Sequence, residues 1–134
     1  MKKRISVLVA IVLIVIMSVS TALADYSCPS SNFFAGGRMF LVTTKITSNK
    51  KDACAKTSGG TNTYDTVNAT YYWLNMMTDD VGHYSETKSA GIEVQSTATS
   101  LTGTNKIYYK IISNHSGSYE GASGSVSNVL TLIN

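Results

Sequence analysis

An alternation of apolar and polar side chains runs through residues 66–77 and is the clearest structural signal in the chain. Its apolar positions are Val67, Ala69, Tyr71 and Trp73. Successive side chains of a β-strand point to opposite faces, so a period of two residues indicates a strand with one buried face. We therefore predict a strand over residues 66–77, with these apolar side chains in the core.

The same pattern, in weaker form, predicts further strands. Their ranges are 38–47, 84–99, 106–113 and 126–133, with a possible bend of the second at Ala90-Gly91. The polar segments 48–62 and 114–124 are predicted to be mostly turns and loops. No stretch after residue 24 repeats apolar residues at helical spacing. We expect an all-β domain, a small antiparallel β-sandwich of about six to seven strands, with a small β-barrel as the alternative.

Residues 1–24 follow a different pattern. A positive start, Met1-Lys2-Lys3-Arg4, precedes an apolar run over residues 5–19 and the small-x-small sequence Ala22-Leu23-Ala24. This order is typical of a bacterial secretory signal peptide cleaved after Ala24. A membrane anchor is the alternative, but about 15 apolar residues span only about 22 Å as a helix, less than the roughly 30 Å hydrocarbon core. We expect a secreted, extracellular protein with a single domain over residues 25–134.

The charge of the chain is concentrated in the predicted signal peptide. The whole sequence has a formal net charge of +3, and Lys2, Lys3 and Arg4 account for all of it. The predicted mature domain is therefore formally neutral. A neutral domain lacks the excess of basic side chains that draws proteins to nucleic acid or anionic lipid, so we expect no nucleic-acid partner.

Both cysteines of the chain, Cys28 and Cys54, lie in the part that is predicted to be exported. An even number of cysteines in an oxidising compartment predicts a disulfide, here with a stabilisation of about 3.5 kcal/mol in the loop-entropy model. Two free thiols are the alternative. A metal site would require more ligands at close spacing than these two residues supply.

Four residues with metal-binding side chains lie close together in the sequence: Asp79, Asp80, His83 and Glu86. Carboxylate and imidazole groups could hold a divalent cation at a hairpin. The simpler interpretation is a solvated turn, since Asp-Asp before Val-Gly is ordinary turn chemistry. The spacing matches neither an EF-hand nor the H-E-x-x-H motif. We expect no bound metal and no cofactor.

Catalytic signatures are missing from the sequence. His83 and His115 are its two histidines, and both are expected to be surface imidazoles. Ser116 is adjacent to His115, but neighbouring side chains of an extended chain point apart. There is no G-x-S-x-G nucleophile motif. We expect a protein that is not an enzyme; a small hydrolase built on one of these histidines is the catalytic alternative.

Aromatic residues supply the candidate ligand face. The strand phases place Tyr71, Trp73 and Tyr109 in the core and Tyr72 and Tyr108 on the solvent-facing side of the sheet. Exposed rings on a rigid sheet can stack on sugar rings or anchor a protein partner. The alternative is cross-strand pairing that only stabilises the sheet. We predict Tyr72 and Tyr108 as the ligand face.

These observations predict a non-catalytic extracellular interaction or surface-binding module. Its expected partner is a cell-wall glycan or a surface protein, and the oligomeric state is left open. The alternative is a secreted bacteriocin- or toxin-like antagonistic protein. A membrane partner is expected only in that alternative, with the apolar strand over residues 39–46 as the segment that would insert.

Overall fold

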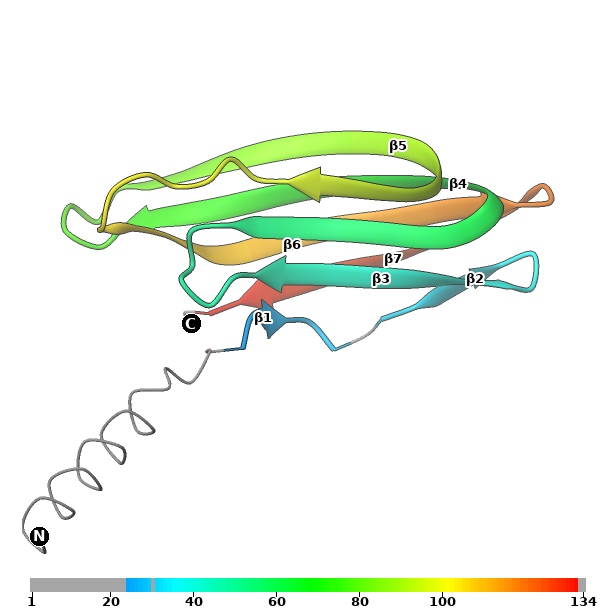
Figure 1. The fold of residues 1–134 in the computed structure, drawn as a ribbon, viewed down its shortest axis with the longest axis horizontal. Helices are drawn as coiled ribbons and strands as arrows, with labels where there is room; N and C mark the ends of the chain where they lie inside the picture. The colour runs from blue at the N-terminus through cyan, green and yellow to red at the C-terminus, as the bar shows by residue number, and fades with distance from the viewer. Residues whose placement is uncertain (1–23, 30, 133–134) are drawn as a thin grey trace, which may run out of the picture.

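Antiparallel β-strands build almost all of the molecule (Figure 1). The computed structural model describes residues 24–29 and 31–132. The predicted signal peptide, except for Ala24, lies outside the described residues. The strands within the described part are β1 (Tyr26–Ser27), β2 (Phe33–Ala35), β3 (Arg38–Ile46), β4 (Ala53–Asn75), β5 (Val81–Thr97), β6 (Lys106–Tyr119) and β7 (Ala122–Thr131).

The strands form one seven-stranded sheet in the order β1-β3-β4-β6-β7, with β2 paired to β3 and β5 paired to β4. Every pairing is antiparallel. The prediction of an all-β antiparallel domain is confirmed. The sheet curls on itself as a half-barrel, and the finer choice between a sandwich and a closed barrel stays a prediction.

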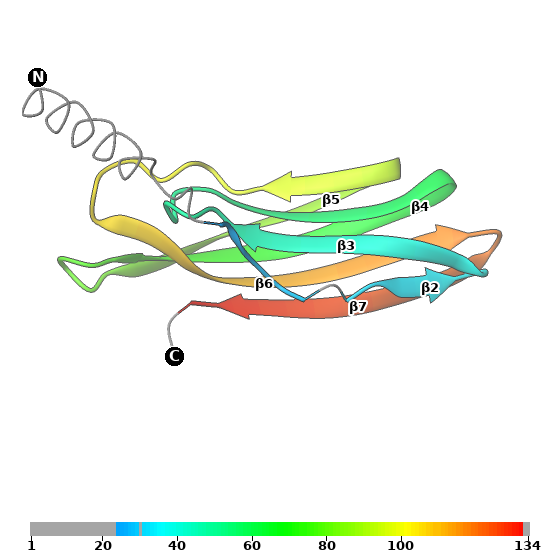
Figure 2. The same ribbon diagram turned by 60° about the horizontal axis from the view of Figure 1, so that its bottom comes forward.

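The curl arises because β4 and β5 each turn back on themselves partway along (Figures 1 and 2). Their shared register shifts between Ser58 and Gly60 and again between Gly60 and Tyr64. Gly60 has a φ of +85° and Ile92, its partner on β5, has a φ of 72°. Left-handed residues at a register shift bend a strand sharply. The first part of β4 therefore faces its second part across the core. The predicted bend at Ala90-Gly91 lies beside this turn.

Two segments that were predicted to be turns are strands in the structure. Residues 53–62 belong to β4, and residues 114–119 belong to β6. The ring of Phe40 explains the small residues there: a Cβ atom at Gly59 would lie 2.4 Å from the ring, and one at Gly117 would lie 2.2 Å from it. These glycines make room for packing and do not break the strands.

The core lies between the facing parts of the curled sheet and falls into two clusters. The larger is built around Tyr71, Tyr108 and Ile111, all essentially inaccessible to solvent. The smaller contains Phe33 and Phe40, whose rings stack with centroids 4.8 Å apart. The prediction that Val67, Ala69 and Tyr71 face the core is confirmed, whereas Trp73 is only half-buried.

The predicted disulfide is wrong for this fold: Cys28 and Cys54 are both free thiols. Ser27 pairs with Lys45, and Lys45 pairs with Cys54, so a whole strand separates the two segments. Two strand spacings amount to about 9.5 Å, beyond the roughly 7 Å between Cα atoms that a disulfide tolerates. In addition, Cys28 packs against the larger core cluster, whereas Cys54 lies beside Lys45 on the outside of the sheet.

Candidate functional site

The predicted ligand face does not form as expected, because Tyr72 and Tyr108 lie on opposite faces of the sheet. Tyr108 is 1% exposed, its ring packs edge-on against Tyr71 with centroids 6.3 Å apart, and its hydroxyl donates to the Thr99 carbonyl at 2.6 Å. The cause is a bulge. Tyr72 pairs with Lys110 but the next residue of β4 pairs with Tyr108, which leaves Tyr109 as an extra residue.

Tyr109 takes the place that was predicted for Tyr108. Its ring lies beside that of Tyr72, with centroids 6.5 Å apart. On the two neighbouring strands, the His83 ring lies 5.9 Å from the Tyr72 ring and Lys110 Nζ lies 5.5 Å from its centroid. We call these four residues the aromatic end. The one-residue bulge turns Tyr108 inward and Tyr109 outward. The alternation of apolar and polar residues in the sequence did not indicate this bulge.

A row of uncharged polar side chains continues from the aromatic end along the same outer face. Cross-strand hydrogen bonds join Thr70 to Ser85 at 2.9 Å and Thr66 to Ser89 at 2.8 Å. Asn68 donates to Thr87 at 2.6 Å. We call the whole set the polar ladder. Its members, on β4 to β7, are Thr66, Asn68, Thr70, Ser85, Thr87, Ser89, Asn114, Ser116, Ser125 and Ser127.

The far end of the polar ladder is marked by Tyr64, which is 58% exposed. Beside it the surface has a shallow hollow of about 170 Å³. Five of the six residues that line it carry a hydroxyl group: the lining consists of Tyr64, Thr66, Ser116, Gly117, Ser118 and Ser123. The outer face therefore has an aromatic contact at each end and, along β4 and β5, hydrogen-bonding groups between them; on β6 and β7 the apolar Ile112 and Val129 lie beside Thr70. No alternation in the sequence singled out Tyr64, because it follows directly on the bend of β4.

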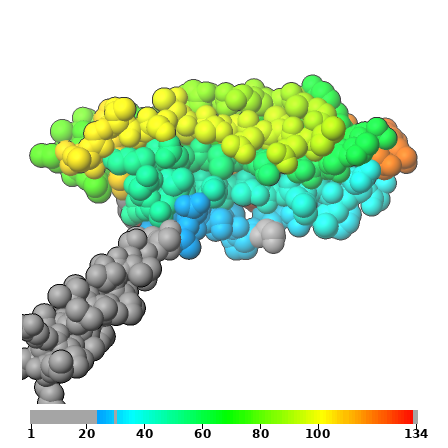
Figure 3. All heavy atoms as spheres, viewed as in Figure 1, coloured from blue at the N-terminus to red at the C-terminus, as the bar shows by residue number. Residues whose placement is uncertain are grey.

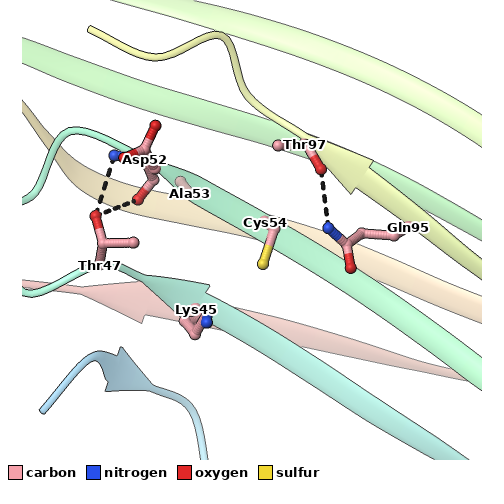
Figure 4. Close-up of a pocket in the computed structure, with 7 residues that line it drawn as sticks. All are labelled: Lys45, Thr47, Asp52, Ala53, Cys54, Gln95 and Thr97. Atoms are coloured by element: carbon pink, nitrogen blue, oxygen red, sulfur yellow. Dashed lines mark hydrogen bonds between the residues drawn. The ribbon is translucent and has the colours of Figure 1, made fainter.

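A second hollow, of about 150 Å³, lies on the opposite outer surface, over β3, the start of β4 and the end of β5 (Figure 4). These elements lie on the face that Figure 3 shows. Cys54 lies in it, but burial raises the pKa of its thiol and so keeps it protonated. Lys45 pairs with Asp25 at 3.0 Å. Thr47 bonds to the backbone of Asp52, and Gln95 bonds to Thr97 (Figure 4). Its lysine is committed to Asp25 and no aromatic ring lines it, so this hollow is the weaker candidate.

The two histidines differ sharply. His83 is exposed, as predicted, whereas the prediction of a surface imidazole at His115 is wrong. The Nδ1 atom of His115 lies 2.8 Å from the Thr57 hydroxyl and its Nε2 atom lies 2.8 Å from the Ser113 hydroxyl. Burial lowers the pKa of His115 to about 4. The ring is therefore neutral at physiological pH and out of reach of a substrate.

The four candidate metal-binding residues do not converge. Asp80 accepts a hydrogen bond from Thr78 at 2.6 Å, while His83 lies against Tyr72. Glu86 accepts a hydrogen bond from Ser96 at 2.8 Å and pairs with a neighbouring lysine at 3.1 Å. Asp79 is exposed in the turn. Within the described ranges, no three such side chains are grouped as a metal site would require.

Comparison with known proteins gives no indication of function. No family model matches the chain, and no curated protein matches it. Among the described residues, no helix has the length and apolar character needed to cross a membrane. The aromatic end and the polar ladder are thus the features from which a function can be argued.

Proposed function

We propose that the chain is a small secreted bacterial β-sandwich protein that acts as a non-catalytic surface-binding module, and that its partner is a cell-wall glycan. The observation that carries this proposal is the aromatic end, where Tyr72 and Tyr109 lie side by side on the outside of the sheet. The proposal includes export, with removal of the signal peptide after Ala24.

The aromatic end has the chemistry that sugars require. A tyrosine ring offers an apolar face to the C–H groups of a pyranose, and its hydroxyl can bond to the sugar hydroxyls at the ring edge. Lys110 and His83 add donors next to the Tyr72 ring. Few types of surface combine flat apolar area with several hydrogen-bonding groups at its rim, and a glycan fits this combination well.

The rings are also held in place before any ligand arrives. β4 is paired on one side with β5 and on the other with β6 at Tyr72, so its backbone is fixed by both neighbours. The close contacts between Tyr72, His83 and Tyr109 restrict the side chains further. Binding then costs little additional conformational entropy, which favours affinity from a small contact area.

The direct test removes the two rings together. In a Tyr72→Ser/Tyr109→Ser variant, retention on purified bacterial cell walls should fall about fivefold or more, because two aromatic contacts of about 0.5–1.5 kcal/mol each are lost. Tyr26→Ser is the matched control, since Tyr26 is 38% exposed and lies on β1, away from the aromatic end. Unchanged retention of a folded double variant would contradict the proposal.

The chemical class of the partner is tested on the walls themselves. Digestion of the glycan strands before the assay should abolish retention, whereas protease treatment should leave it intact. The reverse result would assign the aromatic end to a surface protein instead of a glycan.

A second candidate function, an antagonistic protein that acts on membranes, is favoured by one observation. Phe34 and Met39 are paired across β2 and β3 and are both exposed, and Leu41 continues the apolar row. Dye release from liposomes by the wild-type protein, and its loss in a Met39→Ser/Leu41→Ser variant, would support this function. Liposomes that stay intact would eliminate it.

A further inference from the structure

Both ends of the outer face lie on one uninterrupted stretch of strand. Tyr64 and Tyr72 are eight residues apart on β4 and therefore on the same face. The pairing of β4 with both neighbours runs without a register shift between these two residues. At about 3.3 Å of rise per residue, the tyrosines lie roughly 27 Å apart along the strand. That distance is much longer than a single sugar ring.

The surface between the two tyrosines is suited to a polyhydroxyl ligand. A hydroxyl group has one donor and two acceptor sites, so a single cross-strand bond such as Thr66–Ser89 leaves capacity on both partners. The ladder side chains carry no charge. This pattern matches a neutral, hydroxyl-rich polymer better than a nucleic acid or a polyanion, which would call for basic side chains.

The hollow beside Tyr64 adds a distinct contact at the far end. Its volume of about 170 Å³ is surrounded by hydroxyl groups from three strands. A bulky polar substituent of a sugar could enter it while the ring of that sugar lies on Tyr64. The far end is therefore equipped to act as a second binding point.

We infer that the outer face binds one extended glycan chain along β4, from the aromatic end across the polar ladder to Tyr64, so that only a chain of several sugar rings engages both ends. This inference rests on the proposed function and specifies its ligand as a long, neutral, linear glycan. A second contact on the same chain becomes effectively intramolecular, so affinity should rise steeply once the fragment spans the two tyrosines.

The test compares glycan fragments of graded length with a variant of the far end only. The probes are soluble, neutral fragments from partial digestion of chitin, and the measurement is titration calorimetry with the purified protein. For the wild type, affinity should increase with length and then reach a plateau. The variant is Tyr64→Ser, which should fold normally because its side chain is largely exposed; Tyr26→Ser is the matched control.

Tyr64→Ser should weaken binding of the longest fragments roughly three- to tenfold, the size of one aromatic contact, and leave binding of the shortest fragments unchanged. Equal effects on short and long fragments, no effect on long ones, or an affinity independent of length would overturn the inference. Those results would leave the proposed function standing as long as Tyr72→Ser/Tyr109→Ser still abolishes binding. A wild type that binds neither fragments nor walls would overturn the proposed function itself.

Discussion

The inner and outer faces of the curled sheet carry similar polar side chains in opposite environments. On the inner face, the hydroxyls of Thr44, Thr57 and Ser113 all lie within hydrogen-bond distance of His115, and Thr44 and Ser113 are also 2.7 Å from each other. On the outer face, Thr66 and its neighbours form single cross-strand bonds and remain in contact with water.

This difference shows that burial decides what a serine or threonine does. A buried hydroxyl must satisfy its hydrogen bonds within the protein, because an unpaired one costs about 1–3 kcal/mol. The inner cluster is therefore a structural network with its groups committed to each other. The outer hydroxyls have no such cost, because water forms hydrogen bonds with them. A ligand can replace this water.

The largest difference in stability between the two faces is expected for substitutions at Gly117 and at its neighbour Ser116. Gly117→Val should destabilise the protein by about 3 kcal/mol or more, because a Cβ atom would lie 2.2 Å from the Phe40 ring on the inner face. The adjacent Ser116→Val, which points outward, should change stability by only about 0.5 kcal/mol. Urea unfolding of both variants measures the contrast, and similar midpoints would show that the inner face is not tightly packed.

A smaller effect is expected from pH, through His115. Burial lowers the pKa of this residue in the folded protein from its ordinary value of 6.5 to about 4. The unfolded chain therefore takes up a proton at higher pH than the folded one, and stability decreases as the pH falls below 6.5 and levels off below about 4. Between pH 7 and pH 5 the loss should be about 2 kcal/mol.

The control for this pH effect is His115→Gln, which keeps a polar side chain but cannot titrate. Its stability should be nearly constant between pH 7 and pH 5. Chemical unfolding at several pH values provides the measurement. A wild type with the same flat profile as the variant would contradict the buried neutral imidazole.

The smallest expected effect concerns reduction. A reducing agent should not change the stability of the protein. Cys28 packs against the larger core cluster and Cys54 lies outside, so reduction has no bond to break. The unfolding midpoint of the purified protein should be the same with and without dithiothreitol, and mass spectrometry after alkylation of the unfolded chain should show two modified thiols. A midpoint lowered by the equivalent of 2–4 kcal/mol would indicate a bridge and hence a different register.

The fold class followed from periodicity, because the alternation around Val67 and Tyr71 depends only on the geometry of a strand. The residues that deviate from that rule do so for tertiary reasons. Gly59 and Gly117 are strand residues under the Phe40 ring, and a single sequence does not reveal which ring will cover them. Glycine therefore suggested turns where the structure has close packing.

The candidate site was only half predictable for a similar reason. Tyr72 was placed on the outer face correctly, but the bulge opposite it buries Tyr108 and brings Tyr109 to the surface. A bulge depends on how two strands pair over their whole length, and this information is not local to either strand. The wrong disulfide has the same origin, since the separation of Cys28 and Cys54 depends on the pairing with β3.

The central claim, that the outer face is the ligand surface, is tested most directly by amide NMR of the purified protein titrated with soluble cell-wall fragments. We predict that the shifts concentrate at Tyr64, along the polar ladder and at the aromatic end. Shifts confined to the hollow around Cys54 or to the exposed row at Phe34 and Met39 would contradict the account, because the ligand would then bind a face that we assign no such role.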